Sequence, residues 1–391
     1  MDAAAIVDLT PKVLHVIGVL DRWSVETWLL RMLAHAKARG EALDWTFYCA
    51  FAQAGSRDDD ARALGAGVVR SPVPIGEKLA FAKALRTELE RGRYDVLHCH
   101  HDLISGVYLA ASVGVPIGSR LVHVHNLDES VLTPNPLKQS VLRPALRRTC
   151  LSLADKIIAN ADHALAAFLA GHRRDPERHL VHALGLDPGP FASAHADRAG
   201  FRHSFGLAPD TPILLFAGRM TPEKNPVFAV DVLASLRRRL PEAVAVFAGA
   251  GDLEAAVSAR AIELGISDAV RLLGWRDDVA EVMSASDWFI LPHPHEPMEG
   301  FGIAVVEAQL AGLRLLLSLG VSDAPLLRGA AAKRLSLHEG ADAWADAALD
   351  LWQAPAPSRA TALAAFRASP MDLDRALDDL MAIHAGAKAL A

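Results

Sequence analysis

Apolar runs of six or seven residues recur along the chain and alternate with longer amphipathic stretches. In the first half, helical intervals such as residues 25–38 and 78–90 separate the runs. Continuous apolar strands joined by helices of about 10–15 residues are typical of a parallel sheet covered on both faces. The first half therefore predicts a doubly wound α/β domain. Its strands are KVLHVIG (12–18), WTFYCAF (45–51), GVVRSPV (67–73), DVLHCH (95–100), SRLVHVH (119–125) and DKIIAN (155–160).

This pattern lapses between residues 186 and 212, where GLDPGPFASAHADRAGF is dense in Pro, Gly, Ala and Asp, which predicts a linker with a short connecting helix. A second alternating series then begins. Ligands of such sheets bind outside the carboxyl ends of the strands, so two such domains in sequence predict a binding cleft between them. The new strands are PILLFAG (212–218), AVAVFAG (243–249), VRLLGW (270–275), DWFILP (287–292) and LRLLLS (313–318).

The domain boundaries follow from this lapse. We predict an N-terminal domain over residues 1–190, a linker over 191–211 and a C-terminal domain over 212–370. Residues 371–391 contain MDLDRALDDLMAIH, which predicts a last amphipathic helix that packs back toward the N-terminal domain.

Composition narrows the class of protein. The 391 residues carry a net charge of −6, which gives no reason to expect nucleic acid as a partner. Three widely spaced cysteines, Cys49, Cys99 and Cys150, predict reduced thiols rather than disulfides. The N-terminal stretch lacks the basic start of a secretion signal, and no apolar run reaches the ~20 residues of a membrane span. We expect a cytoplasmic protein that is soluble or peripheral to the inner face of the membrane.

The stretch FAGRMTPEKNP (216–226) leads from a strand into a helix that should begin near Asn225 and Pro226. Arg219 and Lys224 would stand beside that helix start, after Gly218. Two cations and free helix N–H groups suit a pyrophosphate. On spacing alone, two solvated surface charges remain an alternative.

The stretch AGAGDLEAA (248–256) also joins a strand to a helix. A dinucleotide-binding fingerprint would need a third glycine where Glu254 stands, which weakens an oxidoreductase interpretation. We expect Gly249 and Gly251 to let the backbone turn tightly or approach a ligand.

In EGFGIAVVE (299–307), two carboxylates bracket an apolar run. A helix should begin near Gly302 and stop at Gly312, which puts Glu307 in its second turn and Glu299 just before it. The alternatives are a loop end with a solvated helix residue, or two carboxylates that face one hydroxyl-rich ligand.

Taken together, GRM-TPEKN, FAGAGDL, LGWRDDV, EGFGIAVVEAQLAG and VSD resemble retaining glycosyltransferases of family 4, which have the GT-B fold. The resemblance is strongest to the branch that builds bacterial capsular and extracellular polysaccharides. KVLHVIG, VETWLLRML, YDVLHCHHDLISGV and VHVHN extend it into the first half, so it covers nearly the whole chain.

The resemblance implies two Rossmann-like domains, of which the C-terminal one binds a nucleotide-sugar donor such as a UDP- or GDP-sugar. Arg219 and Lys224 would hold the pyrophosphate, Glu307 the ribose, and Glu299 with Gly300, Phe301 and Gly302 the sugar. The base would meet Gly274, Trp275 and Arg276, and His125 would face the donor sugar across the cleft. The acceptor, a saccharide or lipid-linked saccharide, would dock on the N-terminal side. The implied acceptor-side residues are Trp23, Ser24, His100 and Asn126.

No cofactor and no metal are expected in this chemistry. Departure of a nucleoside diphosphate develops negative charge, which fixed cations can stabilise. We expect the acidic run at residues 58–60 to lie in a loop after the second strand and to be solvated. In retaining members the donor phosphate itself is thought to deprotonate the acceptor, so we name no enzyme base.

One departure from the family concerns the loop after the first strand. Where relatives carry Gly-Gly, this chain has Trp23 and Ser24, which could alter acceptor recognition, have no consequence, or abolish activity. Two other functions therefore stay open: a nucleotide-sugar epimerase of similar architecture, and a donor-binding scaffold without activity.

Two further features allow alternatives. His98, His100 and His101 invite a metal interpretation, but their place at a strand end favours lining the cleft; most of the 17 histidines should lie at the surface. His293, His295 and Glu296 give no stronger metal signal. Residues 136–151 are either a membrane-facing patch for a lipid-linked acceptor or a solvated helix face that Pro144 interrupts. The basic residues of that segment are Lys138, Arg143, Arg147 and Arg148.

Overall fold

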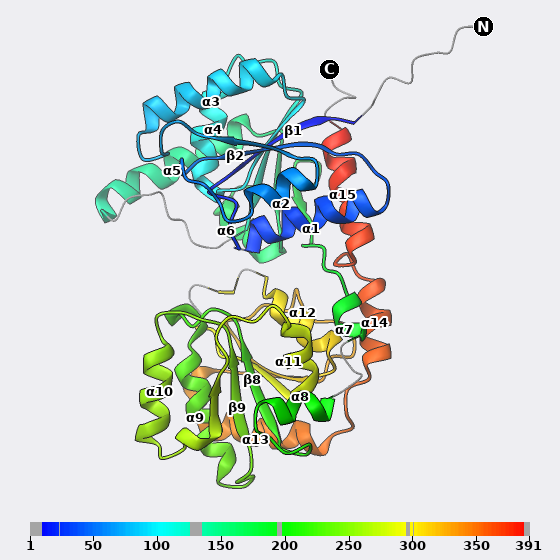
Figure 1. The fold of residues 1–391 in the computed structure, drawn as a ribbon. Coiled ribbons are helices and arrows are strands. Elements are labelled where there is room, and N and C mark those ends of the chain that lie inside the picture. Colours follow the sequence, from blue (N-terminus) through cyan, green and yellow to red (C-terminus); the bar gives the residue numbers. More distant parts are fainter. Residues whose placement is uncertain are drawn as a thin grey trace, which may run out of the picture. The chain divides into compact units, whose positions relative to one another are not determined.

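Two parallel sheets organise the chain (Figure 1). The computed structural model describes residues 10–22, 24–125, 135–193, 198–294, 298–299 and 301–386. One unit comprises Met1–Leu186 and Leu373–Ala391, and the other comprises Asp187–Asp372. Each unit is a doubly wound α/β domain of the Rossmann type.

The first unit is built on a seven-stranded sheet in the order β3-β2-β1-β4-β5-β6-β7, with every pair parallel. The strand order reverses between β1 and β4. The short edge strand β7 was not predicted. The strands are β1 (Lys12–Ile17), β2 (Asp44–Cys49), β3 (Gly67–Arg70), β4 (Val96–Cys99), β5 (Ser119–Val124), β6 (Lys156–Ala159) and β7 (His179–Val181). The helices are α1 (Ser24–Ala38), α2 (Asp58–Ala63), α3 (Lys78–Gly92), the 3₁₀ helix η1 (Asp102–Ile104), α4 (Ser105–Ala111), α5 (Pro136–Leu153), α6 (Asp162–Leu169) and α15 (Leu373–Ala385).

One face of this sheet is an apolar core. Alternate strand residues such as Leu14, Leu97 and Val122 pack against side chains of α3, α4 and α5. All three cysteines are buried and unpaired, as the sequence predicts. Burial raises the pKa of the Cys49 and Cys150 thiols to about 12, so these groups stay protonated at neutral pH.

The opposite face carries histidines and aromatic residues instead. His123 of β5 contacts Trp28 of α1, and His98 of β4 contacts His384 of α15. Helices α1 and α15 lie side by side here (Figure 1). Nine histidines of the described chain are buried, so the expectation that most lie at the surface is wrong. They are His15, His98, His100, His123, His125, His179, His182, His293 and His384.

Helix α15 is joined to the first unit by polar contacts as well. Asp374 of α15 lies 2.7 Å from His35 Nε2, and Asp378 accepts a hydrogen bond of 2.7 Å from Arg39. His182 Nε2 lies 2.8 Å from the Ala376 carbonyl oxygen. The end of the chain therefore completes the first unit.

The second unit has a six-stranded parallel sheet in the order β10-β9-β8-β11-β12-β13. The strand order reverses between β8 and β11; the polar edge strand β13 was not predicted. The strands are β8 (Ile213–Ala217), β9 (Val244–Ala248), β10 (Val270–Leu272), β11 (Trp288–Leu291), β12 (Arg314–Ser318) and β13 (Ala332–Leu335). The helices are α7 (Gly189–Ser193), α8 (Arg198–Ser204), α9 (Pro226–Arg237), α10 (Glu254–Glu263), α11 (Val279–Ala285), α12 (Ile303–Leu310), α13 (Gly340–Gln353) and α14 (Arg359–Arg367), with 3₁₀ helices η2 (Pro222–Lys224), η3 (Ser267–Ala269) and η4 (Leu337–Glu339).

The range predicted as a linker is part of the second unit. Arg202 of α8 is buried and donates to Asp287 Oδ2 over 2.8 Å, and Arg198 donates to Asp287 Oδ1 over 2.5 Å. The same carboxylate accepts from the Ile213 N–H of β8. Because both arginines bind a residue 85 or more positions away, α8 is fixed against the start of β11 rather than free.

Helix α5 runs through Pro144 without a break, so the predicted interruption is wrong. Asn135 caps its first turn by accepting from the N–H groups of Leu137 and Lys138. Leu137 and Val141, one turn apart, are 78% and 70% exposed. Among the described residues, no helix combines the length and the apolar character that crossing a membrane requires.

Candidate functional site

The carboxyl ends of β8 and β11 lie where the strand order of the second sheet reverses. At such a point the two following loops diverge to opposite sides of the sheet and leave room for a ligand. The loop after β8 carries Arg219 and Lys224, and the segment after β11 carries Glu299. The predicted phosphate-side and sugar-side residues are therefore held at one edge of one sheet.

The loop after β8 leads directly into a helix. Gly218 has a φ of 151°, and Asn225 is left-handed with a φ of 50°. Pro226 is the first residue of α9, so the predicted helix start is confirmed. Arg219 is 65% exposed at the side chain, and its Nη2 lies 3.6 Å from Glu223 Oε1.

An ion pair joins this loop to the segment after β11. The Lys224 ammonium donates to the Glu299 carboxylate, and the two side chains are only 18% and 12% exposed. Asn225 Nδ2 also donates to the Pro292 carbonyl over 3.3 Å. These contacts hold a cation and a carboxylate in a partly dehydrated position, where their interaction with a ligand is stronger than in water.

His293 adds a third group that the sequence did not assign to this site. Its Nε2 lies 3.8 Å from Glu299 Oε2, and burial lowers its pKa. The signal that could have found it is its position directly after the apolar run DWFILP, at a strand end. His295 and Glu296, its proposed companions, lie outside the described residues.

Helix α12 begins beside Glu299, as the sequence predicts. Glu299 N–H donates to the Gly320 carbonyl over 2.8 Å, and Gly302, with a φ of 78°, precedes the first helical residue. Phe301 is buried, and Glu307 is half-buried in the second turn. Gly300 lies outside the described residues. The first turn of α12 supplies N–H groups without intrahelical partners, which suit a ligand oxygen.

The loops after β8, β9 and β10 are hydrogen-bonded to one another. Gly218 N–H donates to the Ala248 carbonyl over 3.0 Å, and Gly249 N–H donates to the Gly274 carbonyl over 2.8 Å. A Cβ at Gly249 would lie 1.9 Å from the Gly218 carbonyl oxygen, and one at Gly251 would lie 2.6 Å from that of Met220. Both glycines therefore let neighbouring loop backbones pack closely, and their predicted approach to a ligand stays a prediction.

The loop after β10 presents an aromatic side chain. Trp275 follows Gly274, which has a φ of 65°, and is 55% exposed. Arg276 Nε donates to Asp278 Oδ1 over 2.7 Å, which fixes the guanidinium within this loop. An exposed tryptophan held on a short, tied loop offers a flat surface for a ring.

In the first unit, the predicted residues are less exposed than expected. Ser24 is exposed at the start of α1, whereas Trp23 and Asn126 lie outside the described residues. His125 is buried, its N–H donates to Asp102 Oδ1 over 2.8 Å, and its Nε2 lies 3.1 Å from His100 Nδ1. Burial and, secondarily, His101 lower the pKa of His125 to about 3, so its ring is neutral.

Burial corrects the interpretation of the strand-end histidines. His98 and His100 are buried under α1 and α15 and do not line an open surface. His100 was predicted on the acceptor side, but its two ring nitrogens lie within 3.1 Å of His15 and His125. It therefore stands behind His125, and any effect of His100 on a ligand passes through that ring.

Family models match both units. The model described as "Glycosyl transferase 4-like domain" matches residues 24–185, and the one described as "Glycosyl transferases group 1" matches residues 197–359. The putative glycosyltransferase EpsF of Bacillus subtilis is 28% identical over 346 residues, 86% of each chain.

Two other proteins extend the comparison. A D-inositol 3-phosphate glycosyltransferase of Actinosynnema mirum is 30% identical over 340 residues, 82% of this chain and 80% of that one. Among solved structures, Anabaena HepE in complex with UDP superposes with a TM-score of 0.75 at 17% identity, over 96% of this chain and all of that one.

Proposed function

The chain belongs to the glycosyltransferases of the GT-B fold, and from that premise we propose that it moves a sugar from a nucleoside-diphosphate sugar to a saccharide or lipid-linked saccharide. The transfer retains the anomeric configuration, needs no metal ion, and serves cell-surface polysaccharide biosynthesis. The observation that carries the proposal is the Lys224–Glu299 pair at the reversal point of the second sheet, beside Arg219 and the start of α12.

The donor diphosphate binds at the loop after β8. The Arg219 guanidinium and the Lys224 ammonium contact its oxygens. The N-terminal ends of α9 and α12 also favour negative charge. As the bond between the sugar C1 and the phosphate oxygen breaks, the electron pair stays on that oxygen. The two cations stabilise this charge more than they stabilise the intact donor, which lowers the barrier.

The contacts to the ribose, the sugar and the base are assigned from the positions of the side chains around the loop after β8. Glu307, in the second turn of α12, accepts hydrogen bonds from the ribose hydroxyls, and Glu299 with the start of α12 holds the sugar. Trp275 stacks on the base. The solved HepE structure holds UDP, which supports a uridine nucleotide as one donor class to test.

The acceptor binds to the first unit. Its hydroxyl oxygen attacks C1 on the face from which the diphosphate leaves, and its proton passes to the departing phosphate oxygen. No side chain is needed as the base. The neutral ring of His125 contributes a hydrogen bond to the sugar rather than a charge.

The direct test is a binding panel followed by turnover. UDP, GDP and their sugars are added to the full chain in a thermal melt, because a ligand that binds the folded state raises the midpoint. Transfer and donor hydrolysis are then measured for the wild type, for Glu307→Ala, and for Glu281→Ala, an exposed glutamate of α11, as the matched control.

Each outcome separates the alternatives. A glycosyltransferase loses turnover in Glu307→Ala and keeps it in Glu281→Ala. Conversion of the donor to an isomer without acceptor indicates the epimerase, and stabilisation by a nucleotide without any transfer indicates the inactive scaffold. Equal turnover in wild type and Glu307→Ala, or no response to any nucleotide, contradicts the proposed site.

A further inference from the structure

Five histidines form a layer on one face of the first sheet. His15 of β1, His98 of β4 and His123 of β5 share this face on three neighbouring strands, and His15 is the register partner of His98. His100 and His125 follow β4 and β5 by one residue. All five are buried, with at most 5% of each residue exposed. Glycosyl transfer as proposed above uses only His125.

The rings form two hydrogen-bonded chains of three. In one, His15 Nδ1 lies 3.0 Å from His100 Nε2, and His100 Nδ1 lies 3.1 Å from His125 Nε2. In the other, His98 lies 3.3 Å from His123 and 3.0 Å from His384.

Those bonds do not satisfy every ring nitrogen. His15 Nε2, His123 Nε2 and His125 Nδ1 are buried and have no hydrogen-bond partner among the residues that the structure describes. In a neutral imidazole one ring nitrogen donates and the other accepts. A hydrogen-bonded chain of three rings therefore leaves one ring nitrogen without a histidine partner at each end of the chain. Buried polar atoms without partners are unfavourable and require an explanation, and a bound water or ion is one such explanation.

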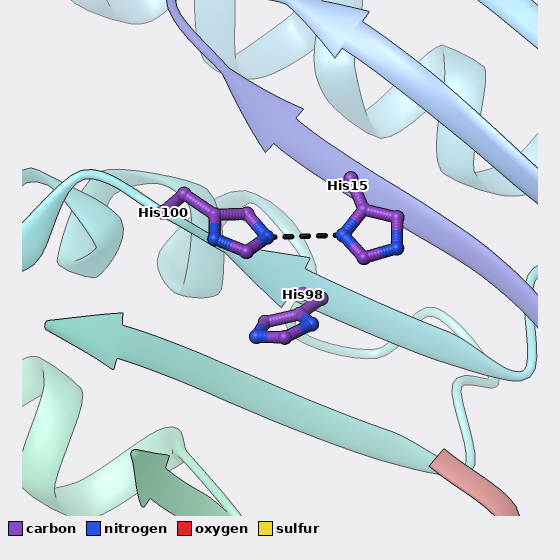
Figure 2. A group of neighbouring side chains, drawn as sticks. All are labelled: His15, His98 and His100. Atoms are coloured by element: carbon purple, nitrogen blue, oxygen red, sulfur yellow. Dashed lines mark hydrogen bonds between the residues drawn. The ribbon is translucent and has the colours of Figure 1, made fainter. Parts of the chain in front are cut away.

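We propose that His15, His98 and His100 bind one first-row transition metal ion of the Zn²⁺ class. Figure 2 shows the three rings together, with His100 and His15 edge to edge. One nitrogen from each lies within 4.8 Å of the other two. Zinc–imidazole bonds of about 2.0–2.1 Å place two ligand atoms of a tetrahedral ion about 3.4 Å apart. The His15–His100 pair at 3.0 Å is already near that spacing, and small ring rotations bring in His98.

The donor set selects the class of ion. Three imidazoles without a carboxylate suit zinc, cobalt, nickel or copper rather than magnesium or calcium. Burial lowers the pKa of all three rings well below the ordinary value, so they are unprotonated and able to coordinate at neutral pH.

The surroundings match those of a metal centre. A ligating histidine generally donates its second ring N–H to a neighbouring acceptor, which fixes its orientation. His100 has His125 for this role, and His98 has His123 or His384. An ion here would link β1 to β4, which are more than 80 residues apart in the chain, and would stabilise the first unit rather than take part in transfer.

A second group, His100 with His123 and His125, is less suited. All three of its ring pairs are stacked, with interplanar angles of 27°, 24° and 19°, so the nitrogens lie side by side. In the first group, the His15–His100 pair is also near-parallel, at 24°, but the two pairs that include His98 are tilted by 38° and 34°, so this group departs further from a parallel stack.

The test measures metal per chain by elemental mass spectrometry on untagged full chain, produced with Zn²⁺ in the medium and washed with chelator. We expect close to one Zn²⁺ per chain in the wild type and at least a tenfold lower content in His15→Gln and His98→Gln. His182→Gln is the matched control, because His182 is buried against His123 of the layer but does not belong to the group. It should keep its metal.

A second measurement uses the wild-type chain and therefore does not depend on whether the variants fold. Chain produced with Co²⁺ in place of Zn²⁺ should show visible absorption, and X-ray absorption should count three imidazole nitrogens around the ion. The proposal is overturned if the wild type holds less than a tenth of an ion, both as purified and after refolding with Zn²⁺. It is also overturned if folded His15→Gln and His98→Gln keep the wild-type metal content.

Discussion

Lys224 and Glu299, 75 residues apart in the chain, form an ion pair that joins the loop after β8 to the segment that precedes α12. The pair thus positions one cation and one carboxylate of the proposed donor site from two different loops. Arg219, which faces Glu223 and is mostly exposed, is the more adjustable of the two cations. Lys224 is the one that the fold holds in place.

Removing Lys224 should therefore affect the chemical step. We expect Lys224→Met to lower kcat for transfer by about 100-fold or more, the loss typical of removing one group that stabilises developing negative charge. Lys333→Met is the control, since Lys333 pairs with Asp350 at an exposed position of the same unit. Steady-state kinetics with saturating donor measure both. Wild-type kcat in Lys224→Met would remove Lys224 from the mechanism.

Trp275 should act on binding rather than on chemistry. Stacking of a base on an aromatic side chain contributes about 1–3 kcal/mol, so Trp275→Ala should raise KM for the donor by roughly 5- to 150-fold with a smaller change in kcat. Trp275→Phe should retain most of the affinity. Leu272→Ala, at an exposed position of β10, is the control. A donor KM that is unchanged in Trp275→Ala would show that the base binds elsewhere.

The buried Asp287 should stabilise the second unit. Asp287→Asn removes the charge that pairs with Arg202, and breaking a buried pair typically lowers the free energy of unfolding by about 3–5 kcal/mol. Asp346→Asn, which breaks an exposed pair with Arg239, should cost at most about 1 kcal/mol. Chemical denaturation of both variants measures the difference. Equal losses would mean that α8 is held by other contacts.

The histidine layer predicts sensitivity to acid. Burial lowers the pKa of His15, His98, His100, His123, His125 and His384, to about 3 for His125 and His384, from an ordinary value of 6.5. Below pH 6.5 the unfolded chain therefore binds more protons than the folded one. The contribution of these histidines to the free energy of unfolding is fully present above that pH. It decreases as the pH falls, by at most about 1.4 kcal/mol per pH unit for each histidine.

Denaturant unfolding of metal-free protein at pH 7.5, 6.0 and 5.0 measures this slope. His384→Gln should make it shallower, because one buried titrating group is removed. His338→Gln, at an exposed position, should leave it unchanged. A free energy of unfolding that stays constant from pH 7.5 to 5.0 would contradict the burial of these rings.

The exposed start of α5 predicts contact with a lipid surface. Leu137 and Val141 lie one turn apart beside Lys138, and burying such side chains contributes about 1.5–3 kcal/mol each. Changing both to Ser should weaken sedimentation with anionic vesicles by roughly tenfold or more. Leu79→Ser, an equally exposed leucine on α3, is the control. If the control loses as much, or the wild type does not bind vesicles, α5 is a solvated helix.

The two sheets and the loops that follow their strands could be predicted because apolar runs of strand length are local signals. Strands β7 and β13 could not, since HLV and AKRL are short and partly polar and become strands only beside an existing edge. The sequence predicts a short connecting helix in this region, but not that α8 is fixed to the second unit. Its stability comes from Asp287, a partner that no local pattern reveals.

For the candidate site, too, some features could be predicted from the sequence and others could not. The residues predicted for the donor side lie in loops marked by Gly and Pro and near helix starts. The types and spacing of Arg219, Lys224, Glu299 and Glu307 therefore predict that they lie at the same edge of the second sheet. The burial of His98 and His100 depends on α1 and α15 covering the sheet, and the latter comes from the other end of the chain. The sequence predicts that these two histidines lie on or directly after a strand, but not that α15 covers them.

The burial of Cys49, Cys99 and Cys150 has a practical consequence for labelling. Only a thiolate reacts quickly with maleimide reagents, and the raised pKa of these thiols keeps them protonated as well as shielded. A cysteine introduced at an exposed position such as Leu79 would react far faster than the three native ones. A fluorescent probe can thus be attached at one chosen point without replacing any native cysteine of the core.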